Sequence, residues 1–475
     1  MRPAARSATI GLVPIAHVEA APAMPATTRL PFSGLLLAAL LFGAGAARAQ
    51  GANAVASTPS QVRPAVEQAF SRLTAAPAVQ QLLDAVKADH ERSIADLRLL
   101  TEIEAPPFKE QRRAEAFLAR ARALGLADAH IDGEGNVVGL RKGSGHGPKL
   151  LLSAHLDTVF PAGTDVKVRQ DGSRYSAPGI ADDTRGLAVL LSWLKVLNDQ
   201  RVQTVGDLLI VANTGEEELG NLRGIKRIFA EHLDIDGMVG IEPVADGIVL
   251  VLGTASHRHE VTFKGPGGHS HGAFGQVPSA IHGMGRAIAR IAEIRTPTVP
   301  RTTFTVGLVS GGTSVNAIAP DARMAIDIRS DAMEPLLETE KKILAAVDQA
   351  VVEENARWGV DSLSASTRLI GDRPGGRTPA DSPIVEAATR ANAAFGLRTL
   401  LTGASTDANV PMSLGIPAII VGAGGRSGGL HALSEWIDLG GAWQGAQISL
   451  LTVLGLVGVQ GVSEPLLARR PPRTK

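Results

Sequence analysis

Short hydrophobic runs alternate with segments of helical periodicity along the first half of the chain. The runs at 149–153, 207–212 and 238–241 are mostly apolar, as expected for strands buried on both faces of a sheet. Between the first two runs, the spacing of an amphipathic helix is followed by Leu187, Leu190, Leu191, Leu194 and Leu197. Strands alternating with helices predict an α/β domain with a mixed, mostly parallel sheet and helices on both of its faces.

The pattern changes near residue 255, where polar and apolar residues begin to alternate as they do in half-exposed strands. The predicted elements, in order, are strand 259–263, helix 278–294, strands 302–309 and 323–328, helix 334–355 and strand 362–369. This βαββαβ order is that of a ferredoxin-like unit, so we expect an inserted α+β domain at 255–368.

The α/β pattern resumes after the insertion. It predicts a helix over 383–394, a strand over 418–421 and an apolar helix over 442–456. We therefore expect the α/β domain in two parts of the chain, at 76–254 and 369–465.

The N-terminal residues have the features of an export signal. An uncharged stretch at 30–47 follows Arg29, and Ala47-Arg48-Ala49 fits the small-x-small cleavage rule. A retained membrane anchor is the alternative, but the apolar stretch is short for a span. We predict a signal peptide at 1–49, a periplasmic or secreted mature chain, and no stable membrane insertion after cleavage. Small and polar residues at 50–75 predict a flexible leader.

The composition limits the chemistry that the chain can perform. The 475 residues include no cysteine, so a metal site must use histidine, aspartate or glutamate. The 47 basic and 47 acidic side chains balance one another, which argues against nucleic acid as a partner.

Polar residues of metal-binding type follow the predicted strands of the α/β domain. His155 and Asp157 follow the first strand, and Asp182-Asp183 precede a helix. In open α/β sheets, ligands bind at the carboxyl ends of the strands. A nearby carboxylate can fix the tautomer of a metal-bound histidine, and an aspartate can bridge two cations. A solvated loop histidine and an N-cap aspartate are the simpler alternatives.

Three adjacent glutamates are the clearest local signal. Glu216, Glu217 and Glu218 follow the strand at 207–212 and repel one another, so a cation or the start of a helix must compensate their charge. An acidic first helical turn is the alternative. In metal-assisted hydrolysis, one such carboxylate binds the metal and a neighbour moves the proton of the attacking water.

Two further candidates complete a set of nitrogen and oxygen ligands. Glu242 ends the strand at 238–241, and His431 follows a glycine-rich loop at 422–429. Glycines such as Gly424 let the backbone approach a substrate closely. The joint presence of all these strand-end residues favours a metal-dependent hydrolase over the separate structural explanations.

Two other functions are compatible with parts of the sequence. Gly425-Arg426-Ser427-Gly428-Gly429 fits the elbow of serine hydrolases, but His431 follows too soon to leave room for an intervening acid. A non-catalytic exported binding protein is the other alternative, which loss of a metal ligand would favour.

Taken together, the motifs resemble those of the co-catalytic zinc exopeptidases and deacylases. This family includes aminoacylase, acetylornithine deacetylase, succinyl-diaminopimelate desuccinylase, the folate-cleaving glutamate carboxypeptidase and peptidase T. The matching segments are Ser-Ala-His-Leu-Asp-Thr-Val, Gly-Ile-Ala-Asp-Asp, Asn-Thr-Gly-Glu-Glu-Glu, Ile-Glu-Pro, Gly-Gly-His-Ser and Gly-Gly-Leu-His. The resemblance covers about residues 90–460 and is closest to peptidase T-like members.

The resemblance implies two zinc ions per subunit, with cobalt or manganese as alternatives. One ion would be held by His155, Asp182 and Glu242, and the other by Asp182, Glu217 and His431, with Asp182 bridging. Each ligand would therefore come from a different strand-end loop.

The resemblance also implies roles for three residues beside the ligands. Glu216 would be the general base, and Asp157 would orient His155. Asp183 would follow a cis peptide bond. Thr184-Arg185-Gly186 stands where the family often has Lys-Gly after the paired acids, so the substrate contacts next to them are not carried over.

The inserted segment resembles the family's lid and dimerisation domain, so we expect a homodimer. His269 would reach the partner's site and stabilise an oxyanion, and Asn316 and Arg329 would hold a substrate carboxylate or carbonyl. Ordinary polar residues at strand ends are the alternative. The other lid histidines, His257, His259 and His271, are expected to be solvated or locally bonded.

The predicted reaction is hydrolysis of a terminal amide bond in a small peptide. The enzyme would be a di- or tripeptidase, an aminopeptidase or a carboxypeptidase. The main alternative is a deacylase that cleaves an N-acyl amino acid at the same site.

Overall fold

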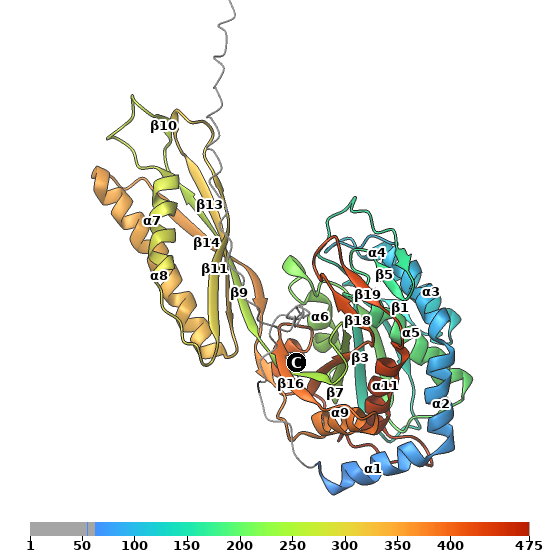
Figure 1. Cartoon of the computed structure of the whole chain (residues 1–475). Helices are drawn as coiled ribbons and strands as arrows, with labels where there is room; N and C mark the ends of the chain where they lie inside the picture. The colour runs from blue at the N-terminus through green and yellow to red at the C-terminus, as the bar shows by residue number, and fades with distance from the viewer. Residues whose placement is uncertain (1–54, 56–61, 475) are drawn as a thin grey trace, which may run out of the picture. The chain divides into compact units, whose positions relative to one another are not determined.

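Residue 55 and residues 62–474 are described by the structure, which is a computed structural model (Figure 1). The predicted signal peptide at 1–49 lies outside the described residues. Among the residues that are described, no helix is long and apolar enough to cross a membrane.

A nine-stranded sheet lies at the centre of the α/β part (Figure 1). Its strands, in spatial order, are β1 (His130–Ile131), β2 (Val137–Arg141), β6 (Asp207–Asn213), β3 (Lys149–His155), β7 (Gly237–Glu242), β17 (Ala418–Gly422), β8 (Ile248–Gly253) and β15 (Gly376–Arg377), and β16 (Leu400–Ala404) also pairs with β8. The central strands β6, β3, β7 and β17 run parallel, whereas β2 and β8 are antiparallel to their neighbours on this path. The predicted mixed, mostly parallel sheet is confirmed.

Helices cover both faces of this sheet because alternate strand residues enter two different cores. In β3, Leu150 and Leu152 pack into one core and Leu151 into the other. The first core is covered by α1 (Pro64–Ala75), α2 (Pro77–Ala88), α4 (Gln111–Ala123), α5 (Thr184–Asp199), α9 (Pro383–Ala394) and α11 (Trp443–Val457), and α3 (His90–Thr101) contacts α5. The second is covered by α6 (Arg223–Glu231) and α10 (Asn409–Ser413). Burial on both faces explains the mostly apolar runs of the strands.

The segment 64–75, which we expected to belong to a flexible leader, is the packed helix α1. Val66, Phe70 and Leu73 are fully buried, and Arg63 and Glu67 pair with residues of α9. The prediction was wrong here because the many small and polar residues conceal an apolar stripe at helical spacing, which only the neighbouring helices reveal as a core face.

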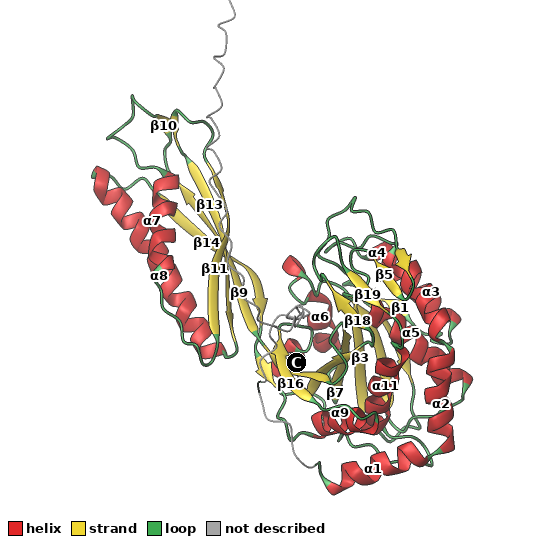
Figure 2. Cartoon of the chain, viewed as in Figure 1, coloured by secondary structure: helices red, strands yellow, loops and turns green. Residues whose placement is uncertain are grey.

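Residues 255–373 form a second sheet with two helices on one face (Figure 2). Along the chain the elements are β9 (Ala255–Lys264), α7 (Ala280–Ala292), β11 (Thr302–Gly311), β13 (Asp321–Ser330), α8 (Met333–Trp358) and β14 (Ser364–Arg373). The spatial order β11-β13-β9-β14 is antiparallel throughout. This βαββαβ segment, here called the lid segment, has its own core, which includes Phe263, Met324 and Ile343.

Three short pieces complete the described secondary structure. Near the carboxyl ends of the central strands, a small sheet contains β18 (Arg426–Gly428), β19 (Trp436–Asp438), β5 (Arg174–Ser176) and β4 (Arg169–Asp171). In the lid segment, β10 (Gly268–His269) pairs with β12 (Ala317–Ile318). A 3-10 turn, η1 (Glu218–Gly220), begins at the third of the three glutamates.

Candidate metal centre

The structure brings together all five residues predicted to bind metal. Three of them depend on parallel strands that end at the same edge of the sheet: His155 ends β3, Glu242 ends β7 and Glu217 follows β6. Asp182 directly precedes the N-cap of α5, and His431 follows β18. Asp182 and His431, which are 249 positions apart in the sequence, therefore meet at one site.

The carboxylate of Asp182 lies between two imidazoles. Its Oδ1 is 3.0 Å from Nε2 of His155, and its Oδ2 is 3.2 Å from Nε2 of His431. Each oxygen thus faces a different histidine, which is the arrangement that a carboxylate bridging two cations requires.

One further carboxylate accompanies each histidine. Glu217 Oε1 lies 2.9 Å from His431 Nε2, and Glu242 Oε2 lies 3.9 Å from His155 Nε2. Ligand atoms of His155, Asp182 and Glu217 all lie within 4.8 Å of one another. A second group within the same distance combines His155 with Asp183 and Glu242. The assignment of ligands to individual ions stays a prediction.

The surroundings of His155 favour a positive charge at its imidazole. Nδ1 lies 3.0 Å from the main-chain oxygen of Asp157, and a carbonyl can only accept, so Nδ1 carries the proton. In the neutral ring, Nε2 then presents a lone pair to the carboxylate of Asp182. Burial opposes protonation of His155, but Asp182 and Glu242 outweigh it and raise its pKa well above the usual range.

The buried carboxylates need positive charge as well. Burial raises the pKa of Glu217 to about 7 and also raises that of Glu242. Asp182 is buried too, but hydrogen bonds with His155 and His431 lower its pKa. Concentrated negative charge away from water is costly unless it is compensated. Imidazole and carboxylate donors in this environment fit divalent cations of the zinc type.

The carboxylate of Asp157 makes different hydrogen bonds from the one predicted. Its Oδ1 lies 3.8 Å from His155 Nδ1, whereas its two oxygens accept the backbone N–H groups of Glu216 and Glu217 at 3.0 and 2.8 Å. The main-chain oxygen, not the carboxylate, orients His155. The carboxylate instead fixes the loop that carries the two glutamates.

Asp183 ties the start of α5 to the end of β3. Its carboxylate accepts from the backbone N–H of Gly186 and of His155, both at 3.1 Å. It is therefore the helix N-cap, as the simpler interpretation of one of the paired aspartates expected. The peptide bond between Asp182 and Asp183 is cis, as the resemblance implied.

The lid candidates make local contacts. His269 on β10 is exposed, and the backbone of its neighbour Ser270 donates to the main-chain oxygen of Asn316 at 3.0 Å. Arg329 lies on β13 and donates to Asp327 at 2.7 Å. None of their hydrogen bonds in the described structure involves the metal centre, so their proposed roles stay predictions.

Gly424 is required by packing. Its φ is +79°, and a Cβ added there would lie 2.1 Å from the main-chain oxygen of Ala442, beside the start of α11. The space beside the Cα atom of Gly424, where we expected a substrate, is occupied by the main chain of the protein itself. A main-chain contact of Gly424 with substrate stays a prediction.

Three residues beside the centre were not predicted. Glu435 is fully buried and accepts from the backbone N–H groups of Gly179, Ala181 and Asp182 at 2.8–3.0 Å. Arg373 donates to Oε1 of Glu216 at 3.2 Å and also to its main-chain oxygen. Asp407 accepts from Asn213, at the end of β6, at 2.7 Å. Glu435 has a sequence signal in its position four residues after His431.

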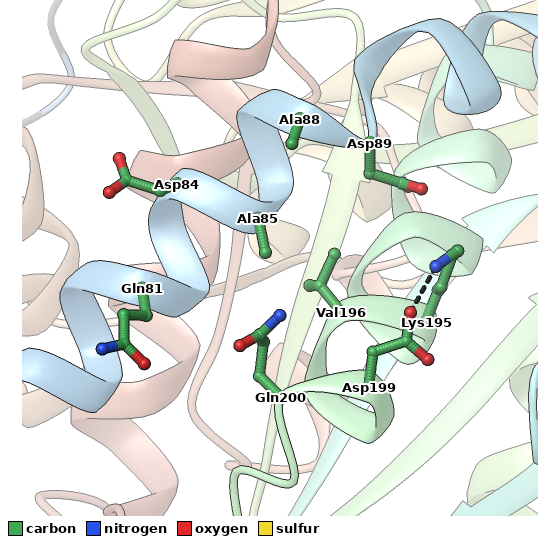
Figure 3. A pocket seen from close by; sticks show the side chains of 9 residues that line it. All are labelled: Gln81, Asp84, Ala85, Ala88, Asp89, Lys195, Val196, Asp199 and Gln200. Atoms are coloured by element: carbon green, nitrogen blue, oxygen red, sulfur yellow. Dashed lines mark hydrogen bonds and ion pairs between the residues drawn. The ribbon is translucent and has the colours of Figure 1, made fainter.

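A hollow elsewhere on the α/β part does not belong to this site (Figure 3). It has a volume of about 410 Å³ and lies between α2 and α5, next to the ion pair of Lys195 and Asp199. It contains no candidate ligand and no histidine. The metal centre is therefore identified by its donor groups, not by cavity size.

The chain is similar to known proteins in sequence. The sequence pattern of peptidase family M20/M25/M40 matches residues 151–454. Carboxypeptidase G2 of Pseudomonas sp. (strain RS-16) is 29% identical over 53% of this chain and 62% of its own length. Acetylornithine deacetylase of Myxococcus xanthus is 26% identical over 67% of this chain and 83% of its own length.

Solved structures show the same fold. A tripeptidase of Staphylococcus aureus superposes with a TM-score of 0.63 at 23% identity, covering 78% of this chain and 98% of its own. A dinuclear metal binding peptidase of Bacillus subtilis superposes with a TM-score of 0.56 at 17% identity, covering 78% of this chain and 99% of its own.

Proposed function

We propose that this chain, which belongs to peptidase family M20/M25/M40 and is a metal-dependent hydrolase of peptide or amide bonds, removes a terminal residue from small peptides with Glu216 as its general base. The observation that carries the proposal is the position of Asp182, with one oxygen facing His155 and the other facing His431. This arrangement supports a centre for two cations, zinc being our proposal for the native ion.

The residues that would hold the ions are His155, Asp182 and Glu242 on one side and Asp182, Glu217 and His431 on the other. When bound, divalent cations supply Lewis acidity, which polarises a scissile carbonyl and makes water acidic enough to react near neutral pH.

Glu216 is placed to move the proton. It is buried next to the ligand Glu217, and its backbone is fixed by Asp157 and Arg373. In the proposed reaction its carboxylate takes the proton of the attacking water and then delivers it to the leaving nitrogen. His269 of a second subunit would stabilise the oxyanion.

The Glu216→Gln variant tests this role. Glutamine keeps the size of the side chain but cannot accept the proton, so we expect kcat to fall by at least roughly 10²-fold. Metal content, measured on the same sample by mass spectrometry, should stay at the wild-type level. The matched control is Glu231→Gln, an exposed residue at the end of α6, which should leave kcat unchanged. Wild-type turnover by Glu216→Gln would refute the assignment.

Deacylation is the second candidate, because the chain resembles acetylornithine deacetylase over most of that enzyme's length. A substrate panel separates the two functions: free dipeptides and tripeptides, the same peptides with blocked amino or carboxyl ends, and N-acyl amino acids, each with and without chelator. Faster cleavage of N-acyl amino acids than of all peptides would reverse the proposal. Activity that survives complete metal removal would end both candidates.

Two further proposals concern the whole protein. The mature chain would be exported, and two chains would associate through their lid segments. The first rests on the sequence at 30–49 and is tested by N-terminal sequencing of the mature protein from its native source.

A further inference from the structure

The lid segment contains a cluster of polar side chains at positions where the strand and helix periodicity predicts apolar residues. On β9, His257 and His259 face the same way as the core residues Val261 and Phe263. On α8, Glu340 lies on the stripe between buried Leu336 and Ile343. The histidines, which we expected to be solvated or locally bonded, are locally bonded but are 9% and 5% exposed, so they are not solvated.

The three side chains converge on one point. Oε1 of Glu340 lies 3.0 Å from Nδ1 of His257 and 2.5 Å from Nε2 of His259. One ligand atom from each of the three residues lies within 4.8 Å of the others. Around a tetrahedral zinc ion, neighbouring ligand atoms are separated by roughly 3.3 Å. A small adjustment of the side chains would therefore admit a cation.

A fourth residue has the position of an outer partner. Oδ1 of Asp372, on β14 directly opposite His257, lies 3.5 Å from Nε2 of that histidine. A metal-bound imidazole usually directs its second nitrogen toward a carboxylate, which fixes the tautomer and strengthens the ligand. His257 thus has Glu340 on one nitrogen and Asp372 on the other.

We propose that His257, His259 and Glu340 bind a divalent cation of the zinc class in the lid segment. This site shares no residue with the candidate metal centre and does not depend on the proposed reaction. With three protein ligands, water would supply the remaining coordination.

Such an ion would link α8 to β9 and, through Asp372, to β14, which are the two strands that connect the lid segment with the α/β part. β9 begins at Ala255, two residues after β8 ends, and β14 ends three residues before β15 begins. The main-chain oxygen of Asp372 also accepts from Nζ of Lys226, and its backbone N–H donates to Oδ1 of Asn221, both residues of the α/β part. The ion would make the junction between the lid segment and the α/β part more rigid.

The test is the zinc content of the full-length mature protein after equilibration with Zn²⁺ and removal of free ion. We expect His259→Gln and Glu340→Gln each to lose about one zinc per chain relative to wild type. The control His271→Gln, an exposed lid histidine, should lose none. In a His431→Ala background, which weakens the candidate catalytic centre, the lid zinc should remain and should still be lost on adding Glu340→Gln.

The two sites can fail separately. If His259→Gln and Glu340→Gln retain the wild-type zinc content, the cluster is only a hydrogen-bonded triad and the proposal is overturned, whatever the result for His431→Ala. If His259→Gln does not fold, the decisive comparison is the Zn²⁺-induced rise in Tm of His431→Ala with and without Glu340→Gln. An equal rise in both proteins would also overturn it.

Discussion

At the scale of single residues, the candidate metal centre depends on its ligands and equally on the side chains that position the ligand loops. Asp157 fixes the loop of Glu216 and Glu217, and Glu435 fixes the loop of Asp182. These buried carboxylates accept backbone N–H groups, which are strong charge-assisted hydrogen bonds in a water-poor environment. Small displacements of a ligand carry a large cost, so the supporting residues are sensitive positions.

The Glu435→Gln variant tests this support. The amide replaces one accepting oxygen with a donor that faces a backbone N–H, so the loop at 179–182 should shift. We expect metal affinity and kcat/KM to fall by about 10–100-fold. The Tm of the metal-free protein should change much less than metal affinity does, which distinguishes positioning from general stability. Wild-type metal affinity in Glu435→Gln would contradict this role.

The buried side chain of His90 should make the stability of the fold depend on pH. Burial and the nearby Arg185 lower its pKa below 6.5, and its Nε2 lies 3.1 Å from the main-chain oxygen of Leu439. Since the unfolded chain binds the proton more tightly, stability is full above the unfolded pKa and falls as the pH decreases below about 6.5. We expect the loss of Tm between pH 7.5 and 5.5 to be smaller in His90→Gln than in wild type. An equal loss would show that His90 does not contribute.

At the scale of elements, α1 shows that the packed domain begins earlier than its composition suggests. The helix contacts α9 and α11, and two ion pairs join it to α9. Surface ion pairs contribute little, so the buried stripe must supply most of the attachment.

Leu73→Ala measures that attachment. Leu73 is 0% exposed, so its truncation should lower the free energy of unfolding by about 2–5 kcal/mol. The matched control is Leu99→Ala on α3, where the side chain is 44% exposed and the expected cost is under about 1 kcal/mol. Denaturant unfolding of both variants provides the values. Equal costs would mean that α1 is not part of the cooperative core.

At the scale of the whole molecule, the lid segment offers an edge for a second chain. β11 is the outer strand of its sheet, and Leu308 and Val309 on it are 72% and 59% exposed. Unpaired edges with apolar side chains are templates for strand pairing. We infer that two copies pair here with two-fold symmetry, which fits the proposed contribution of His269 to the partner's site.

Leu308→Asp tests the association. A charge at the centre of the edge should convert the dimer to monomer in light scattering, with kcat falling by roughly 10²-fold as the oxyanion contact is lost. Leu337→Asp, on α8 and 47% exposed, is the control that should remain dimeric. A wild-type protein that is monomeric at all concentrations would rule out this interface.

The sequence by itself determined the class of fold and the identity of the candidate ligands. Strand periodicity is local, and parallel strands necessarily end at the same edge, so His155, Glu217 and Glu242 had to be neighbours once the strands were identified. Asp182 and His431 lie on loops, where periodicity gives no information, and were selected by residue type; the resemblance to the family then supplied the two ligand sets.

Only the tertiary structure decided which groups hold those ligands. Glu435 and the backbone N–H of Asp182 are separated by 253 positions, and Glu340 is 81 positions from His259. No local pattern encodes such pairs, because they depend on how helices and loops pack on the sheet. The burial of α1 and of the lid histidines was decided in the same way, since exposure is a property of the assembled cores and not of the residue itself.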